Sequence, residues 1–221
     1  MGRQPKAVKL TLASASPRRR ELLAALGLAF TLFPAEVEEN NDADIPAKAL
    51  ALSLSARKAQ KAACGMRDGI VIAADTIVLL AGEVLGKPRD ADEATKMLHR
   101  LRGCSHMVFS GLTLVDVDNR RQWSDVVETE VWMRSYSDEE IAAYVASGDP
   151  LDKAGAYAIQ YAEFRPVAGV RGCYANVMGL PICHLYRALR AWDVEVPVRP
   201  MEACPWARVS GCTYATEVIP S

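Results

Sequence analysis

Hydrophobic and polar positions along the chain form blocks that predict alternating strands and helices. Residues 8–13 (VKLTLA) predict a strand, and residues 70–74 (IVIAA) are a continuous apolar run that is typical of a buried strand. Residues 46–64 are rich in alanine, leucine and lysine and favour a long helix, whereas residues 90–101 show the period of an amphipathic helix. This alternation predicts an α/β protein.

The second half of the chain adds antiparallel strands to this pattern. Residues 106–117 and 122–133 predict two long strands joined by a turn, and recurrent glycines farther on predict several short strands. A last helix is expected over residues 181–192. We therefore expect a mixed twisted sheet with flanking helices in one domain over residues 8–196. The proline-rich residues 197–221 predict an irregular tail that is peripheral to function.

The overall composition argues against several classes of function. No apolar run reaches the roughly 18–20 residues of a membrane-spanning helix. The net charge of -1 does not favour binding to nucleic acid or to an anionic membrane, so a polyanionic ligand would need a local basic pocket. The six cysteines include no Cys-x-x-Cys pair and the three histidines show no ligand spacing. We therefore expect reduced thiols in a cytoplasmic protein rather than a zinc site.

Three arginines follow residues 14–17 (SASP), where serine and proline predict the start of a helix. Cations are disfavoured at a helix N-terminus, because it carries a partial positive charge. A phosphate bound at this turn would reverse the effect, since guanidinium groups grip phosphate through paired N–H groups. We expect Ser14, Arg18 and Arg19 to meet the phosphate and Arg20 to point outward. A solvated basic helix start is the alternative.

Two carboxylates are candidates for the chemistry. Asp75 follows the predicted strand 70–74, which would hold it at the edge of the sheet, and Glu39 lies in an acidic loop. Carboxylates bind Mg²⁺ or Mn²⁺, and they also take protons from water. Asp75 would then act as a base or as a metal ligand that shares the ion with Glu39. A cap on the next turn is the alternative for Asp75, and a solvated charge is the alternative for Glu39.

Four further polar residues complete a set that suits a nucleotide. Lys58 in the long helix, Lys87 in a Gly-Lys-Pro loop and Lys153 among small residues offer cations for phosphates. Gln160 offers an amide donor and acceptor, which suits the edge of a nucleobase. The alternatives are a solvated charge for Lys58, a surface lysine in a turn for Lys87, and a tight packing turn with a surface glutamine for the segment of Lys153 and Gln160.

The ordered motifs resemble those of the Maf family of nucleotide pyrophosphatases. The matching segments are residues 12–30, 73–103, 148–160 and 172–185, and their order and spacing hold from about residue 9 to residue 192. The resemblance implies a cytoplasmic protein that is often a homodimer. Its fold would be Maf/ITPase-like, with two lobes around a central cleft. The resemblance also implies hydrolysis of nucleoside triphosphates between the α- and β-phosphates with a divalent cation, Mg²⁺ or Mn²⁺.

The resemblance also implies roles for particular residues. Asp75 matches the family's proposed proton acceptor, and Glu39, Lys58 and Lys87 match its acidic and lysine positions.

The substrate branch is indicated by three positions. In the branch that acts on 7-methyl-GTP, a Trp follows the Ser-Pro, a Gln follows the Asp and a Glu replaces the late Gln. This chain has Arg18, Thr76 and Gln160 there, which resembles the branch that acts on dTTP and UTP. Tyr161 and Ala162 depart from the family pattern, where glycines are usual.

We therefore expect a pyrophosphatase that converts dTTP or UTP to the monophosphate and diphosphate, without a nucleic-acid or membrane partner. Three alternatives stay open: a pyrophosphatase for another modified nucleotide such as 7-methyl-GTP, a non-catalytic nucleotide-binding regulator of septum formation, and a structural or protein-binding domain. The expected catalytic residues are Asp75, Lys87 and Lys58, the expected substrate-binding residues are Ser14, Arg18, Arg19, Thr76, Lys153 and Gln160, and the expected metal ligands are Glu39 and Asp75.

Overall fold

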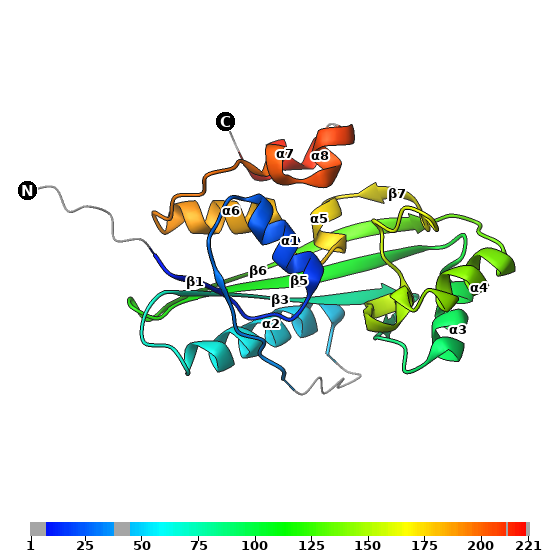
Figure 1. Ribbon diagram of the computed structural model, residues 1–221, viewed down its shortest axis with the longest axis horizontal. Helices are drawn as coiled ribbons and strands as arrows, with labels where there is room; N and C mark the ends of the chain where they lie inside the picture. Colours follow the sequence, from blue (N-terminus) through cyan, green and yellow to red (C-terminus); the bar gives the residue numbers. More distant parts are fainter. Residues whose placement is uncertain (1–7, 38–44, 211, 220–221) are drawn as a thin grey trace, which may run out of the picture.

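A mixed β-sheet with helices on both faces forms the centre of the molecule (Figure 1). The computed structural model describes residues 8–37, 45–210 and 212–219. The strands in these ranges are β1 (Leu10–Leu12), β2 (Thr31–Leu32), β3 (Ile70–Leu80), β4 (Glu83–Leu85), β5 (Ser105–Asp116), β6 (Arg121–Met133) and β7 (Val167–Arg171).

The seven strands combine parallel and antiparallel pairs. Their order is β2-β1-β3-β5-β6-β7, and β4 pairs with β3 beside this row. β1 runs parallel to β2 and to β3, whereas the pairs β3–β4, β3–β5, β5–β6 and β6–β7 are antiparallel. The predicted α/β class with a mixed sheet is confirmed.

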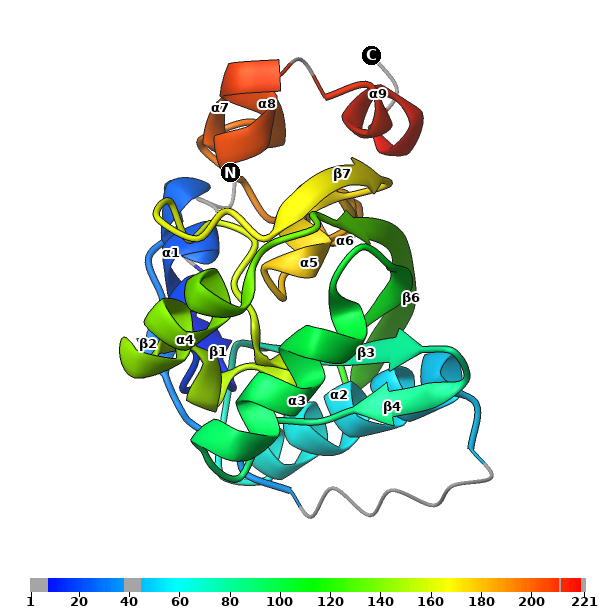
Figure 2. The same cartoon turned by 90° about the vertical axis from the view of Figure 1, so that its right-hand side faces the viewer.

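Helices cover both faces of this sheet. They are α1 (Pro17–Ala25), α2 (Ala47–Ala63), α3 (Ala91–Leu101), α4 (Asp138–Ala146), α5 (Tyr174–Val177), α6 (Ile182–Ala191), α7 (Pro200–Ala203), α8 (Pro205–Ser210) and α9 (Tyr214–Val218), with 3-10 turns η1 (Asp149–Asp152) and η2 (Ala154–Ala156). Figures 1 and 2 show α2 on one face and α1, α5 and α6 on the other, while α3 and α4 pack together at one end. None of the helices in the described ranges has the length and apolarity to cross a membrane.

The apolar interior on the α1 side of the sheet falls into two clusters. One packs α1 and α6 onto the sheet around Ile72 and Leu114. The other packs α3 and α4 around Val78 and Val108, near the opposite end of β3. Each cluster stabilises its own end of the sheet.

On the other face, α2 lies unusually close to β5. A Cβ atom built at Gly111 would lie 2.1 Å from the carbonyl oxygen of Ala51, which is far inside van der Waals contact. The buried face of α2 includes the small residues Ala51, Ser55 and Ala59 beside two leucines. The alanine-rich sequence of this helix therefore serves close packing as well as helix formation.

β3 is longer than the strand predicted over residues 70–74. It continues through Asp75 and Thr76 to Leu80, and β5 pairs with it along nearly this whole length. The hydrogen-bonded ladder with β5 does not break at the polar pair. The predicted position of Asp75 at a strand end is therefore wrong, because Asp75 lies in the middle of a continuous strand.

The last third of the chain is more helical than predicted. The several short strands expected there reduce to β7, because η1, η2 and α5 occupy the other glycine-punctuated segments. The expected helix at residues 181–192 forms as α6, and the tail that was expected to be irregular contains α7, α8 and α9. Pro200 and Pro205 begin α7 and α8, at the first helical position, where proline is favoured.

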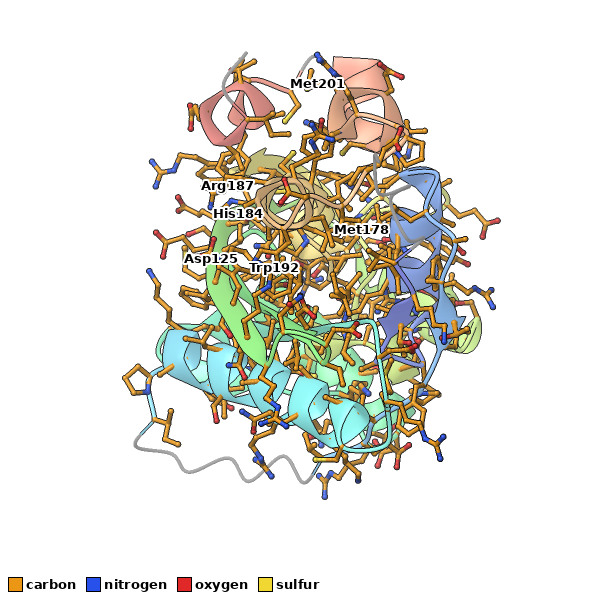
Figure 3. All side chains as sticks on the ribbon, turned by 90° about the vertical axis from the view of Figure 1, so that its left-hand side faces the viewer. Asp125, Met178, His184, Arg187, Trp192 and Met201 are labelled. Carbon is orange, nitrogen blue, oxygen red and sulfur yellow. The ribbon has the colours of Figure 1, made fainter. Side chains whose placement is uncertain are left out.

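The tail packs on the domain. Ala203 belongs to the same apolar cluster as α1 and α6. His184 bonds through Nδ1 to Asp125 at 2.8 Å and through Nε2 to the Tyr214 hydroxyl of α9 at 3.1 Å. Figure 3 shows Asp125 and His184 beside Arg187, which donates to the same carboxylate. The division of the chain at residue 196 stays a prediction.

Candidate active site

The candidate site lies at a gap along one edge of β3. β1 pairs with the first part of this strand, and its last contact is the Ala13 N–H donating to the Ile72 carbonyl at 2.8 Å. β4 pairs with the last part, beginning at Val78. Among the described strands, none covers this edge between those two points. Consecutive strand side chains point to opposite faces, so Asp75 turns toward α2 and Thr76 toward α1.

A cleft of about 520 Å³ surrounds this gap, which is within the range of small-molecule sites. Its walls come from the segment after β1, from α2, β3 and the loop after β4, and from the η1–η2 segment. Glu39 falls outside the described residues, so its share in a metal site stays a prediction. The other candidate residues all line the cleft: Ser14, Arg18, Arg19, Lys58, Asp75, Thr76, Lys87, Lys153 and Gln160.

Asp75 and Lys58 form an ion pair at the base of the cleft. Asp75 is 5% exposed, and the Lys58 Nζ of α2 donates to its Oδ1. A buried carboxylate is costly unless a cation or hydrogen-bond donors compensate it, and the lysine supplies that compensation. Lys58 is therefore not the solvated helix lysine of the alternative interpretation.

The N-terminus of α1 brings two arginines to the cleft. Ser16 caps the helix, and Pro17 occupies its first turn, as predicted. Arg18 and Arg19 line the cleft, whereas Arg20 is exposed and lies outside its lining.

The Arg19 guanidinium is held by three separate segments. Its Nε donates to the Gly179 carbonyl at 2.9 Å, and its two terminal nitrogens donate to Ser14 Oγ at 3.3 Å and to Thr76 Oγ1 at 3.1 Å. A planar guanidinium with several donors suits such a junction. Motif reasoning named Arg19, Ser14 and Thr76, but no signal in the sequence pairs them with one another.

Lys153 is buried among acidic side chains. Its side chain is 6% exposed, and Nζ lies 2.9 Å from Asp149 Oδ1 and 2.5 Å from Asp152 Oδ1. Arg18 Nη1 is 3.9 Å from Asp152 Oδ2. Burial alone would raise the pKa of Asp152, but hydrogen bonding and charge from Lys153 outweigh it, so the pKa lies below its usual value. The sequence showed the Asp152-Lys153 pair but not the contact with Arg18.

Lys87 lines the cleft from the loop after β4. The Gly155 N–H donates to the Gly86 carbonyl at 3.0 Å, which ties this loop to η2. Gly155 has φ +70°, and a Cβ there would lie 3.1 Å from Val78 Cγ1, so a glycine is needed at this junction. Within the described residues, no acidic side chain pairs with Lys87, and it is exposed to the cleft.

The charge of the cleft differs from that of the whole chain. Among the described residues of its lining, five basic side chains face three acidic ones, Glu36, Asp75 and Asp152. The excess of positive charge suits a polyanionic ligand, although the chain as a whole carries -1.

The donor set of the cleft fits a divalent cation that is bound together with its substrate. The described residues contain no group of three or more His, Cys, Asp or Glu side chains that would hold a metal unaided. Asp75 and Glu36 bring carboxylates to the lining. Mg²⁺ commonly takes one or two protein carboxylates and completes its coordination with water and substrate phosphates.

Fold and cleft together define an α/β protein with a basic site of nucleotide size. The chain belongs to the Maf family, whose model, described as Maf-like protein, matches residues 9–192. It is 48% identical over 185 residues to the dTTP/UTP pyrophosphatase of Carboxydothermus hydrogenoformans, and this alignment covers 84% of this chain and 99% of that protein. It is also 44% identical over 188 residues to the dTTP/UTP pyrophosphatase of Moorella thermoacetica, and this second alignment covers 85% of this chain and 97% of that protein.

Among solved structures, the Ham1 protein of Staphylococcus aureus aligns with 57% of this chain and 72% of its own, at 13% identity and a TM-score of 0.41.

Proposed function

We propose that this chain is a nucleoside triphosphate pyrophosphatase that hydrolyses dTTP and UTP to the monophosphate and diphosphate. The observation that carries the proposal is the single cleft lined by Asp75 and five basic side chains. Relatives at 48% and 44% identity that are named dTTP/UTP pyrophosphatase support the same substrate class.

The cations of the cleft divide between binding and charge compensation. Arg18 and Arg19 of α1 and Lys87 from the loop after β4 all line the cleft, and in our proposal they hold the phosphate chain. They offset the negative charge that builds on the departing diphosphate, which is the part of the transition state that gains most from fixed cations. Lys153 is already paired with Asp149 and Asp152, so its proposed contribution is to position Arg18 through Asp152 as well as to meet the substrate.

Asp75 is the proposed catalytic carboxylate. In one role it orients and deprotonates the attacking water. In the other role it would hold the divalent cation, and the proton of the attacking water would leave to solvent. In both roles the α-phosphorus gains the water oxygen, and its bond to the bridging oxygen breaks. The ammonium group of Lys58 donates to Asp75 and holds this carboxyl group in place for both roles. When a divalent cation is bound, Asp75, Glu39 and the substrate phosphates would hold it, and it would neutralise phosphate charge.

Gln160 is the proposed determinant of the base, and Thr76 is a position that differs between the two branches of the family. Gln160 is exposed in the lining, where its amide can pair with the N–H and carbonyl edge of uracil or thymine. The next residue, Tyr161, packs its ring 4.9 Å from that of Tyr144 and bonds to Glu163 at 3.1 Å. The departure from the glycines of the family therefore anchors this loop against α4.

We further infer that the enzyme acts on free nucleotides in the cytoplasm, binds neither nucleic acid nor membrane, and forms a homodimer. The location and the homodimer rest on the family resemblance, whereas the other two expectations rest on the net charge of -1 and on the lack of a long apolar run.

A panel of triphosphates tests the proposed function. Pyrophosphate release from dTTP, UTP, CTP, 7-methyl-GTP and 5-methyl-UTP is measured at one concentration, with and without Mg²⁺. We expect the highest rates with dTTP and UTP, and only when Mg²⁺ is present. Preference for 7-methyl-GTP would favour the other branch of the family, and tight binding of nucleotides without turnover would favour a non-catalytic regulator.

A further inference from the structure

A chain of hydrogen bonds leads from the cleft into the core of the sheet. Thr76 Oγ1 on β3, which accepts from Arg19, lies 2.9 Å from Ser110 Oγ on β5. Ser110 Oγ then donates to the backbone carbonyl of Asn176 in α5 at 3.1 Å. Ser110 is fully buried and is absent from the lining of the cleft.

The direction of every bond in this chain is fixed by its ends. The Asn176 carbonyl can only accept a hydrogen bond, so Ser110 donates its single hydroxyl hydrogen to it. Ser110 must then accept a hydrogen bond from the Thr76 hydroxyl, which uses the single hydrogen of that hydroxyl. Thr76 can therefore act only as an acceptor toward the cleft, where the guanidinium of Arg19 donates to it.

The acceptor at the inner end of the chain is itself immobilised. The Asn176 side chain donates to the Val108 carbonyl at 3.2 Å and to Thr129 Oγ1 at 2.9 Å, which pins α5 to two strands of the sheet. The outer end is equally confined. A Cβ on Gly179 would lie 3.2 Å from Arg19 Nε and 3.3 Å from Thr76 Oγ1, so this part of the wall has little spare room.

From this geometry we propose that Ser110 is a positioning residue: it fixes Thr76 as a hydrogen-bond acceptor and thereby aims Arg19 at the phosphates, without touching the substrate. The inference rests on the proposed pyrophosphatase function. Without the Ser110 hydroxyl, the hydrogen of Thr76 has no buried acceptor, and it can turn toward the cleft and displace the guanidinium.

Ser110→Ala removes one buried oxygen and tests this role. We expect kcat/KM for dTTP to fall about tenfold, the usual scale of one hydrogen bond to a charged group. Ser55→Ala is the matched control. Ser55 is also fully buried, its Oγ lies 2.9 Å from Thr113 Oγ1, and Ser55 is absent from the lining of the cleft. Both variants should lose similar thermal stability, and Ser55→Ala should keep the kcat/KM of the unmodified protein.

A double-mutant cycle separates positioning from general damage to the fold. In a Thr76→Val background the link to Arg19 is already broken, so adding Ser110→Ala should change kcat/KM by less than about twofold. Ser110→Cys, with a weaker donor of similar size, should fall between the serine and alanine forms and serves if the alanine variant does not fold. Equal kcat/KM for Ser110→Ala and the unmodified protein, or full additivity with Thr76→Val, would overturn the inference. Absence of hydrolysis by the unmodified protein would instead refute the proposed function.

Discussion

At the scale of single residues, Asp75 shows how a charged side chain is accommodated within a sheet. It is buried in the middle of β3, where an isolated carboxylate would be strongly unfavourable. Lys58 reaches it from α2, and the small residues of that helix allow the approach. The same side chain stays accessible to the cleft because no neighbouring strand of the described chain closes that edge of β3.

His106 is a second buried titratable residue, on β5. It is 3% exposed, its Nε2 bonds to the Tyr157 hydroxyl at 2.8 Å, and its Nδ1 has no hydrogen-bond partner among the described residues. Burial lowers the pKa of His106 from 6.5 to about 4. The imidazole is therefore neutral in the folded protein at physiological pH.

This lowered pKa predicts that the protein loses stability in mild acid. Below pH 6.5 the unfolded chain binds a proton at His106, but the folded chain does so only near pH 4. The free energy of unfolding should therefore fall by about 3 kcal/mol as the pH drops through this window. Urea titrations between pH 7 and pH 4 measure the effect. His106→Gln, which cannot titrate, should remove this share of the slope, and an unchanged slope would contradict the assignment.

At the scale of elements, local signals and long-range pairing differ in how much the sequence reveals. The start of α1 was predictable because Ser16 and Pro17 act within one turn of the helix. The length of β3 was not, because the pairing that carries it past Asp75 comes from β5, more than thirty residues later in the chain. A polar residue after an apolar run looks the same at a strand end and at an open edge.

The packing of α2 against β5 gives a prediction at this scale. Gly111→Ala should lower the free energy of unfolding by about 1–3 kcal/mol or more, because the new methyl group overlaps the backbone of Ala51. Gly65→Ala is the control, since a Cβ at Gly65 makes only an ordinary contact at 3.6 Å. Denaturant unfolding of the two variants checks this, and similar stabilities would show that the helix can move away at little cost.

At the scale of the whole molecule, motif order indicated the cleft better than any single residue did. Each lysine or arginine alone was compatible with an ordinary surface position. The opposed faces of Asp75 and Thr76 could not be foreseen, because they depend on β3 continuing past both residues, which its pairing with β5 decides. The helical tail was also missed, since its helices are short and depend on packing through residues such as Ala203.

The central claim is that Asp75 and the basic side chains around it direct water to the α-phosphorus of a nucleoside triphosphate. Hydrolysis of dTTP with Mg²⁺ in water labelled with heavy oxygen tests it most directly, with the products separated and weighed by mass spectrometry. We predict label in dTMP, none in diphosphate, and a kcat lowered about 100-fold or more in folded Asp75→Asn. Label in diphosphate, release of orthophosphate, or near-normal turnover by Asp75→Asn would contradict the account.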